Sequence, residues 1–266
     1  MSAFSLGPFV FAGDRLAAIV GIFTFLLVAT FLDRRFVPGL GRAAWWGLLA
    51  GLVGARFGHV VQHWGSFSQG PMRAMAFWQG GFAPLPGAVL ASAAGAVAIR
   101  SWRAAAALVV SAALGLLFWA GTSELTRATL GKAAPTIALA QLDGQPLAIS
   151  DLRGRPSVVN LWATWCPPCR REMPLLARVS AENPEAAFVF VNQAEGPDRI
   201  RTYLKEEELR LGHVLLDPAL EVQRHYAAVG IPLTLFLRAD GTLAGLHVGE
   251  ISPELLQAGL DAAAAR

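Results

Sequence analysis

The two cysteines of this 266-residue chain, Cys166 and Cys169, constrain its fold more than any other feature. Two prolines separate them, a spacing at which two thiols can close into a small disulfide ring and reopen. The apolar run over 158–162 predicts a buried strand before the pair, and residues 170–177 predict a helix after it. Cys166 would then lie at a helix N-terminus, where backbone N–H groups and the helix dipole stabilise a thiolate. The pattern predicts redox exchange.

A zinc site is the alternative for closely spaced cysteines. Such a site needs about four ligands, and the chain has neither a second cysteine pair nor a histidine close to the first. Three histidines of the second half, His213, His225 and His247, show no metal-ligand spacing. We therefore expect no metal and no cofactor other than the redox-active Cys166–Cys169 pair.

Composition predicts a membrane portion. The chain is 54% hydrophobic and 15% charged, with a mean hydropathy of +0.46, which is too apolar for an ordinary soluble domain. Four apolar runs are long enough to cross a bilayer: 16–32, 43–61, 82–99 and 104–121. Because the basic residues flank these runs instead of forming a patch with aromatic residues, the net charge of +3 does not indicate nucleic-acid binding.

Arginine placement predicts the orientation of these runs. The first and third connecting loops carry Arg34, Arg35, Arg42, Arg100 and Arg103, whereas the second loop has only Arg73 and the N-terminus only Arg15. Loops rich in arginine stay in the cytoplasm, so both termini and the CxxC pair would face the other side. We expect a multi-pass protein of the bacterial inner membrane whose cysteines lie in the periplasm, an oxidising compartment.

The first half, residues 1–125, resembles prolipoprotein diacylglyceryl transferase. The likeness is carried by Phe4-Ser5-Leu6-Gly7-Pro8, Gly54-Ala55-Arg56-Phe57-Gly58-His59-Val60 and Trp78-Gln79-Gly80-Gly81. The chain has Asp14 where that family has a tyrosine, and Leu85 or Pro86 where it has a histidine. It also covers only about half of the enzyme. The resemblance therefore implies an inactive copy retained as an anchor or a docking surface.

Arg56 and His59 are the candidate functional residues of this half. An arginine inside a predicted span marks a functional site or a lipid headgroup contact, or it snorkels to the interface. His59 and His63 share one helix face, as haem or metal ligands would, or they are interfacial residues beside Trp64.

The second half alternates predicted strands and helices. After a linker over 126–134, a domain over 135–266 contains predicted strands at 157–162, 187–192, 233–237 and 243–248, and predicted helices at 197–208, 220–226 and 253–264. Asp240-Gly241 predicts a tight hairpin turn, and Ser252 predicts the cap of the last helix. The fold class is therefore multi-domain: an all-α transmembrane bundle of about four helices, then an α/β domain with helices on both faces of a mixed sheet.

This half resembles the thioredoxin-fold TlpA/ResA/DsbE group of membrane-tethered periplasmic thiol–disulfide oxidoreductases. The likeness covers roughly 133–266 and is carried by Ala134-Pro135-Thr136, Leu142-Asp143-Gly144, Asp151-Leu152-Arg153-Gly154, the run from Asn160 to Pro174, and Gly230-Ile231-Pro232-Leu233-Thr234. Cys166, the more exposed thiol at the helix start, would be the attacking nucleophile, and Cys169 would resolve the mixed disulfide.

Further roles follow from this resemblance. Glu172 would be a partly buried carboxylate that tunes the cysteines and relays protons, or else a solvated acid of the first helical turn. It is the better proton-handling candidate because Asn160 stands where thioredoxin has a buried aspartate. Ile231-Pro232 would be a cis peptide facing the CxxC pair and pairing with substrate, or an ordinary trans proline. Trp165, Pro167 and Pro168 would complete the substrate-binding surface.

These patterns predict a membrane-anchored protein-disulfide reductase. Its partners would be periplasmic protein disulfides as substrate, a membrane thiol-electron donor and membrane lipid. The resemblance to the TlpA/ResA/DsbE group implies cytochrome c maturation or metal-site assembly as the substrate class. A disulfide-forming oxidase is the closest alternative, because the spacing of the cysteines does not set the direction of electron flow. Diacylglyceryl transfer or lipoprotein docking by the membrane half is the alternative of a different class.

Overall fold

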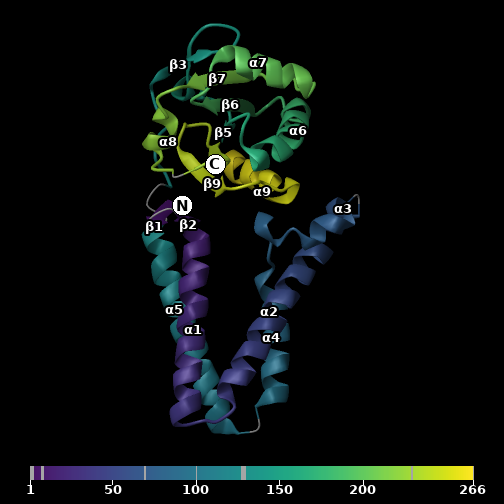
Figure 1. The fold of residues 1–266 in the computed structure, drawn as a ribbon, viewed down its shortest axis with the longest axis vertical. Coiled ribbons are helices and arrows are strands. Elements are labelled where there is room, and N and C mark those ends of the chain that lie inside the picture. Colours follow the sequence, from purple (N-terminus) through teal and green to yellow (C-terminus); the bar gives the residue numbers. More distant parts are fainter. Residues whose placement is uncertain are drawn as a thin grey trace. The chain divides into compact units, whose positions relative to one another are not determined.

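The computed structural model describes residues 3–6, 9–68, 70–99, 101–126, 130–228 and 230–265. The chain divides into two compact units. One is helical and covers Gly13–Leu125; the other contains the C-terminal residues from Thr126 onward, together with the first twelve residues. Figure 1 shows the elements of both units along the chain.

The helical unit contains the four predicted apolar runs as helices. Its elements are α1 (Gly13–Arg35), α2 (Leu40–Gln62), α3 (Trp64–Phe67), the 3₁₀ turns η1 (Pro71–Met75) and η2 (Phe77–Gln79), α4 (Pro84–Ala98) and α5 (Trp102–Thr126). Within the described residues, only Leu16–Arg35 and Trp102–Glu124 combine the length and hydropathy that a membrane span needs. The expected bundle of four spanning helices is therefore not established.

The other two helices fall short for identifiable reasons. Helix α4 has 15 residues, because Pro84 lies at its first turn and the helix ends at Ala98. Helix α2 has 23 residues, but Arg56, His59 and several glycines lower its hydropathy. Arg100, on which part of the predicted orientation depends, lies outside the described residues.

Glycines let the helices of this unit approach closely. A Cβ atom added at Gly54 would lie 2.8 Å from Leu90 Cδ1, and one added at Gly58 would lie 2.3 Å from Pro86 Cγ. Helices α2 and α4 therefore pack through small residues, as helices in membranes commonly do. Helix α1 meets α5 in the same way, with Gly21 against Gly115.

A short hairpin precedes α1 and was missed by the sequence analysis. Strands β1 (Ala3–Leu6) and β2 (Phe9–Ala12) pair antiparallel. The intervening Gly7 and Pro8, which belong to the motif that resembles the transferase, lie outside the described residues.

The C-terminal unit is built on a mixed sheet, as predicted, and this sheet has seven strands. Its strands, in the order β4-β3-β7-β6-β5-β8-β9, are β3 (Ala138–Gln141), β4 (Leu147–Ala148), β5 (Ser157–Trp162), β6 (Ala187–Gln193), β7 (His213–Asp217), β8 (Leu233–Leu237) and β9 (Leu243–Val248). The three inner strands β5, β6 and β7 are parallel, whereas β3, β8 and β9 run antiparallel to their neighbours.

Helices cover both faces of the sheet (Figure 1). Helices α6 (Pro167–Glu182), α7 (Pro197–Glu206) and α9 (Pro253–Ala264) contribute to one apolar core, and α8 (Glu221–His225) and the 3₁₀ turn η3 (Ile149–Leu152) contribute to the other. The side chains of β5 alternate between these two cores, because successive residues of a strand point to opposite faces.

The predicted linker is partly integrated into this unit. The N–H of Gly131 donates to the carbonyl of Leu243, at 2.9 Å, and the N–H of Leu243 donates to the carbonyl of Lys132, at 2.8 Å. The N–H of Ala134 donates to the carbonyl of Gly241, at 2.9 Å. The segment over 131–134 is thus attached to the edge of the domain.

Candidate active site

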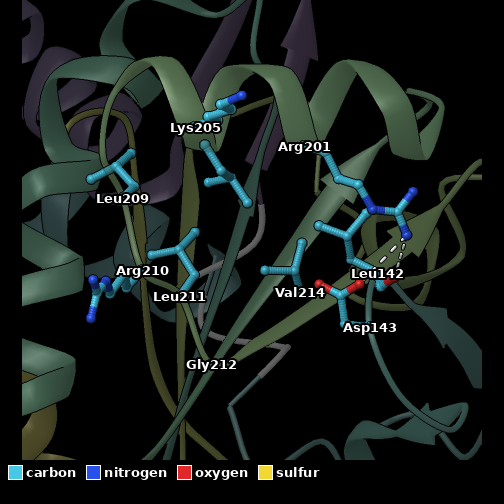
Figure 2. A pocket seen from close by; sticks show the side chains of 10 residues that line it. Leu142, Asp143, Arg201, Lys205, Leu209, Arg210, Leu211, Gly212 and Val214 are labelled. Carbon is cyan, nitrogen blue, oxygen red and sulfur yellow. Dashed lines mark hydrogen bonds and ion pairs between the residues drawn. The ribbon is translucent and has the colours of Figure 1, made fainter.

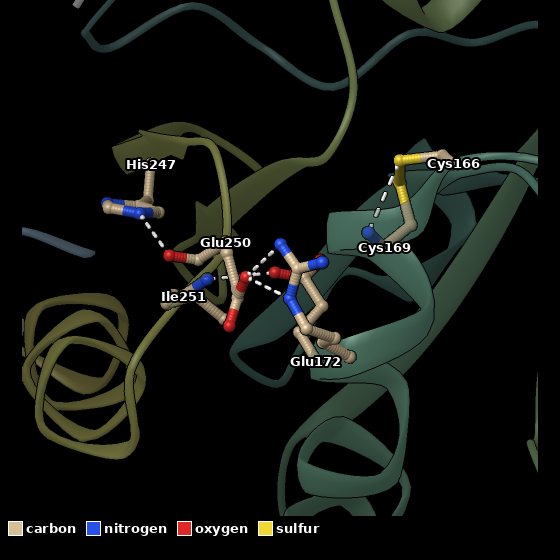
Figure 3. A network of polar contacts seen from close by, with 7 residues as sticks. Cys166, Cys169, Glu172, His247, Glu250 and Ile251 are labelled. Carbon is tan, nitrogen blue, oxygen red and sulfur yellow. Dashed lines mark hydrogen bonds and ion pairs between the residues drawn. A yellow bond between two sulfur atoms is a disulfide. The ribbon is translucent and has the colours of Figure 1, made fainter. Parts of the chain in front are cut away.

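The two cysteines lie where β5 leads into α6. Helix α6 begins at Pro167, whose fixed φ suits the first helical position, and Cys166 is its N-cap. Cys166 and Cys169 form a disulfide, and the N–H of Cys169 donates to Cys166 Sγ at 3.2 Å (Figure 3). The predicted placement of Cys166 at a helix N-terminus is confirmed.

Both cysteines are buried in this oxidised state. Cys166 is 3% exposed and Cys169 is 0% exposed, so the expected difference in accessibility is small. Next to them Trp165 is 61% exposed, Pro167 is exposed and Pro168 is half-buried. The residues that flank the buried pair in sequence thus expose apolar surface. Trp162, by contrast, is fully buried and packs against Tyr203.

The predicted cis peptide is confirmed at Ile231-Pro232. Ile231 packs against the core cluster that contains both cysteines. Pro232 is buried, and its carbonyl accepts the N–H of Gly249 at 2.9 Å. Strand β8 begins directly afterwards and pairs with β5, the strand that leads to the disulfide.

Glu172 lies one helical turn after Cys169 and is 2% exposed, which excludes the solvated alternative. Asn160 Nδ2 donates to its Oε1 at 2.9 Å, and the N–H of Ile251 donates to its Oε2 at 2.8 Å. Burial raises the pKa of Glu172 from 4.5 to about 7, although these two hydrogen bonds and Arg171 lower it in part. The Arg171–Glu250 ion pair lies beside this network (Figure 3).

Asn160 and Thr234 were not predicted as partners of this carboxylate. Asn160 Nδ2 also donates to Thr234 Oγ1, at 3.1 Å, and both residues are buried. The alternation of β5 contained the signal, because Asn160 shares the strand face of Val158 and Trp162, which pack with α6.

A second buried acid, Glu195, was also missed. It follows β6 and accepts the backbone N–H of Thr164 at 2.7 Å, the hydroxyl of Thr164 at 2.6 Å and Asn192 Nδ2 at 2.8 Å. Its ion pair with Arg199 measures 3.0 Å. Burial by itself raises the pKa of Glu195, but these contacts outweigh it and lower the pKa. An ionised Glu195 therefore holds the loop that carries Trp165 and Cys166.

Arg56, the candidate of the helical unit, is engaged with backbone carbonyls. Its guanidinium donates to the carbonyls of Arg73, Ala74, Ala76, Gly80 and Gly81, at 2.7–3.4 Å. His59 is 8% exposed and lies against Gly81, where an added Cβ would be 2.4 Å from its Nε2. The His59 and His63 rings lie 4.3 Å apart. The structure brings Arg56 and His59 together under the segment that follows α3.

A pocket of about 380 Å³ lies elsewhere in the C-terminal unit, between α7 and the residues around β7 (Figure 2). Leucines line it, and Arg201 at its rim donates to the carbonyl of Leu142 at 2.7 Å and lies 3.5 Å from Asp143. None of the predicted site residues lines this pocket, so it is not the candidate active site.

A cysteine pair at the N-terminus of a helix, reached from an inner strand of a mixed sheet, can exchange disulfides with another protein. The C-terminal domain is accordingly a thioredoxin-fold thiol–disulfide oxidoreductase.

Comparison with known proteins agrees with this class. Residues 130–245 match the family model described as the AhpC/TSA family. The chain is 26% identical over 153 residues to the thiol–disulfide oxidoreductase ResA of Bacillus cereus, covering 56% of this chain and 88% of ResA. It is 27% identical over 135 residues to the thioredoxin-like protein YneN of Bacillus subtilis, covering 49% of this chain and 78% of YneN.

Among solved structures, the chain is similar to a putative thiol:disulfide interchange protein DsbE from Chlorobium tepidum. The identity is 26% and the TM-score 0.46, with 50% of this chain and 96% of the other covered. The similarity to ResA agrees with the class of the C-terminal domain, and the match to the family model lies within that domain.

Proposed function

We propose that this chain is a membrane-anchored reductase of disulfide bonds in extracytoplasmic proteins, with cytochrome c maturation or metal-site assembly as the class of process it serves. The observation that carries the proposal is the Cys166–Cys169 disulfide, one helical turn before the buried Glu172. The cysteine pair itself stores the two electrons, so the reaction requires no further cofactor.

The cycle starts from the dithiol form. The Cys166 thiolate attacks one sulfur of a substrate disulfide, forms a mixed disulfide and releases the first substrate thiolate. Cys169 then loses its proton and attacks Cys166 Sγ, which releases the second substrate thiolate and forms the Cys166–Cys169 disulfide. The substrate gains two electrons and two protons, and the enzyme loses them. A membrane thiol-electron donor restores the dithiol, because an oxidising compartment does not.

Glu172 takes up the proton that Cys169 loses. A carboxyl whose pKa is about 7 accepts a proton near neutral pH and releases it again with little cost. Its position one turn along α6 from Cys169 supports this role. Trp165, Pro167 and Pro168 supply the apolar contact surface for substrate, and the backbone beside Ile231 and Pro232 pairs with its extended chain.

The helical unit anchors the enzyme in the inner membrane. Helices α1 and α5 contain the two candidate spans, and α2 and α4 complete a multi-pass unit in contact with lipid, both termini being periplasmic. We retain the resemblance to diacylglyceryl transferase as the proposal of an inactive docking or anchoring copy. Fusion of alkaline phosphatase to the C-terminus tests the topology, since the fusion is active only in the periplasm.

The redox state of the pair in cells tests the direction of the reaction. Rapid acid quenching and alkylation, read as a gel shift, count the free thiols of this chain without ambiguity because it has two cysteines. We expect a predominantly reduced pair, with the C166S/C169S variant as the control for the unalkylated band. A predominantly oxidised pair, in cells with an intact electron supply, would indicate a disulfide-forming oxidase. In either case Cys169→Ser should accumulate mixed disulfides through Cys166.

A further inference from the structure

The amide of Asn160 is satisfied at one end only. Asn160 is 1% exposed, and both hydrogens of Nδ2 have acceptors, Glu172 Oε1 at 2.9 Å and Thr234 Oγ1 at 3.1 Å. The other end, Oδ1, is buried and has no hydrogen-bond partner among the residues that the structure describes. A buried carbonyl oxygen without a donor costs free energy, so its retention in the centre of the sheet requires an explanation.

Protonation of Glu172 would change what it needs from the Asn160 amide, from a hydrogen-bond donor to a hydrogen-bond acceptor. The N–H of Ile251 donates to Oε2 at 2.8 Å, so a proton on the carboxyl belongs on Oε1, the oxygen that faces Asn160. That O–H group needs an acceptor, yet the nearest polar group is the Nδ2 donor. Rotation of the amide by about 180° places Oδ1 there instead.

The carbonyl oxygen then has a partner for each of its two lone pairs. The new O–H of Glu172 and the hydroxyl of Thr234, which can rotate, both donate to it. The observed orientation leaves the carbonyl oxygen without a partner, and the reversed orientation leaves the two N–H hydrogens without one, so the proton on Glu172 decides which orientation is preferred. A carboxamide has nearly the same shape in both orientations, so the exchange needs no movement of β5.

We propose that Asn160 is a positioning residue for Glu172: its side-chain amide reverses whenever Glu172 gains or loses a proton, so that both protonation states are hydrogen-bonded. The charged groups that act on Glu172 are Arg171 and Glu250, which are paired with each other. The thiols of Cys166 and Cys169 titrate only in the reduced protein. In the oxidised protein Glu172 is therefore the group whose proton drives the reversal.

The catalytic consequence rests on the proposed function. When Cys169 gives its proton to Glu172, the reversal of Asn160 supplies the acceptor for that proton at once. Release of the proton returns the amide to the orientation seen here. Such a coupled donor and acceptor lets one buried carboxyl act as a base and then as an acid without leaving its own O–H group unsatisfied.

Nuclear magnetic resonance of the full-length, oxidised protein in detergent micelles tests the reversal. The chain has three asparagines, Asn160, Asn183 and Asn192, so labelling of asparagine with ¹³C and ¹⁵N yields three side-chain amides. We expect the Asn160 ¹³Cγ signal to move downfield and its two amide protons to move upfield as pH falls, with a shared midpoint near 7. Asn183 donates to Val179 O and Asn192 to Glu195, so their signals should stay constant and serve as internal controls.

Two variants separate the reversal from its alternatives. Glu172→Gln should remove the pH dependence of the Asn160 signals between about pH 5 and 9. Thr234→Val preserves the side-chain shape and removes one partner of the amide in both orientations, so the midpoint should stay within roughly half a pH unit of the wild-type value. If the Glu172 carboxyl titrates while the Asn160 ¹³Cγ signal stays constant, the proposal is wrong. If the reversal occurs but Glu172→Gln exchanges disulfides at the wild-type rate, the reversal stands and the proposed proton transfer fails.

Discussion

The polar cluster around Arg56 in the helical unit and the polar cluster around Glu172 in the C-terminal unit are satisfied by hydrogen bonds to different degrees. In the helical unit, the guanidinium of Arg56 donates to five backbone carbonyls. In the C-terminal unit, Glu172 accepts two hydrogen bonds, has a pKa of about 7 and lies beside an amide oxygen that has no partner in the described part of the chain. A guanidinium whose N–H groups donate to backbone carbonyls holds that backbone in place. A buried carboxyl whose pKa lies near neutral pH can instead gain and lose a proton.

Ionisation of the buried Glu172 carboxyl should have the largest effect on the free energy of unfolding. The pKa of Glu172 is raised from 4.5 to about 7, so the folded protein retains a proton that the unfolded chain loses in this range. The resulting stability is present below about pH 4.5 and is lost as the pH rises to 7, a change of roughly 3 kcal/mol. Chemical unfolding of the full chain in detergent at pH 4.5 and pH 8 should show this loss, and Glu172→Gln should not.

Removal of the Arg56 guanidinium should weaken one segment without affecting redox chemistry. Arg56→Met leaves several carbonyls of residues 73–81 without their donor, so amide hydrogen exchange there should accelerate roughly 10- to 100-fold. Arg42→Met, an exposed arginine of the same helix, is the matched control. A change of more than about twofold in the disulfide-exchange rate of Arg56→Met would contradict the structural role assigned to this cluster.

Neutralisation of Glu195 should produce an intermediate effect. Glu195→Gln keeps one acceptor oxygen for Thr164 but loses the charge that pairs with Arg199, so the free energy of unfolding at pH 7 should fall by about 1 kcal/mol. Because the pKa of Glu195 is lowered in the folded state, this contribution exists above the pKa of the unfolded chain and is lost on acidification. The variant and the wild type should therefore converge at low pH, whereas Glu182→Gln, on an exposed helix end, should match the wild type throughout.

Among these variants, a change in the exposed ion pair Arg178–Glu182 should have the smallest effect on the free energy of unfolding. Both side chains are 63% exposed and lie 4.0 Å apart, so Arg178→Ala should change the free energy of unfolding by less than about 0.5 kcal/mol. A larger effect would show that surface charge, and not burial, accounts for the differences among the other variants. The same unfolding experiment at low and high salt provides the check.

Local patterns predicted several elements of the C-terminal unit to the residue. Strands β5, β8 and β9 and helix α9 lie where the apolar runs, the Asp240-Gly241 turn and the Ser252 cap predicted them. The N–H of Leu255 donates to Ser252 Oγ at 3.3 Å, which confirms the cap. Strands β3 and β7 were missed because they are short and their alternation is weak; pairing with each other and with β6 stabilises them.

The helical half shows where such patterns are confirmed only in part. Four apolar runs predicted four spanning helices, and all four runs are helical. Among the described residues, only two of these helices have the length and hydropathy that a membrane span needs. The contacts of Arg56 could not be predicted either, because its acceptors lie 17 to 25 residues away in an irregular segment.

The sequence by itself determined the position of the redox pair. The spacing of Cys166 and Cys169, the apolar strand before them and the proline at the helix start all act within a few residues, so their consequences can be read locally. Only the tertiary structure decided the state of Glu172. Its neighbours come from β5 and from the segment before α9, 12 and 79 residues away. Burial and hydrogen-bond partners belong to the packed chain and not to any one segment, so the proton affinity of this carboxyl arises only on folding.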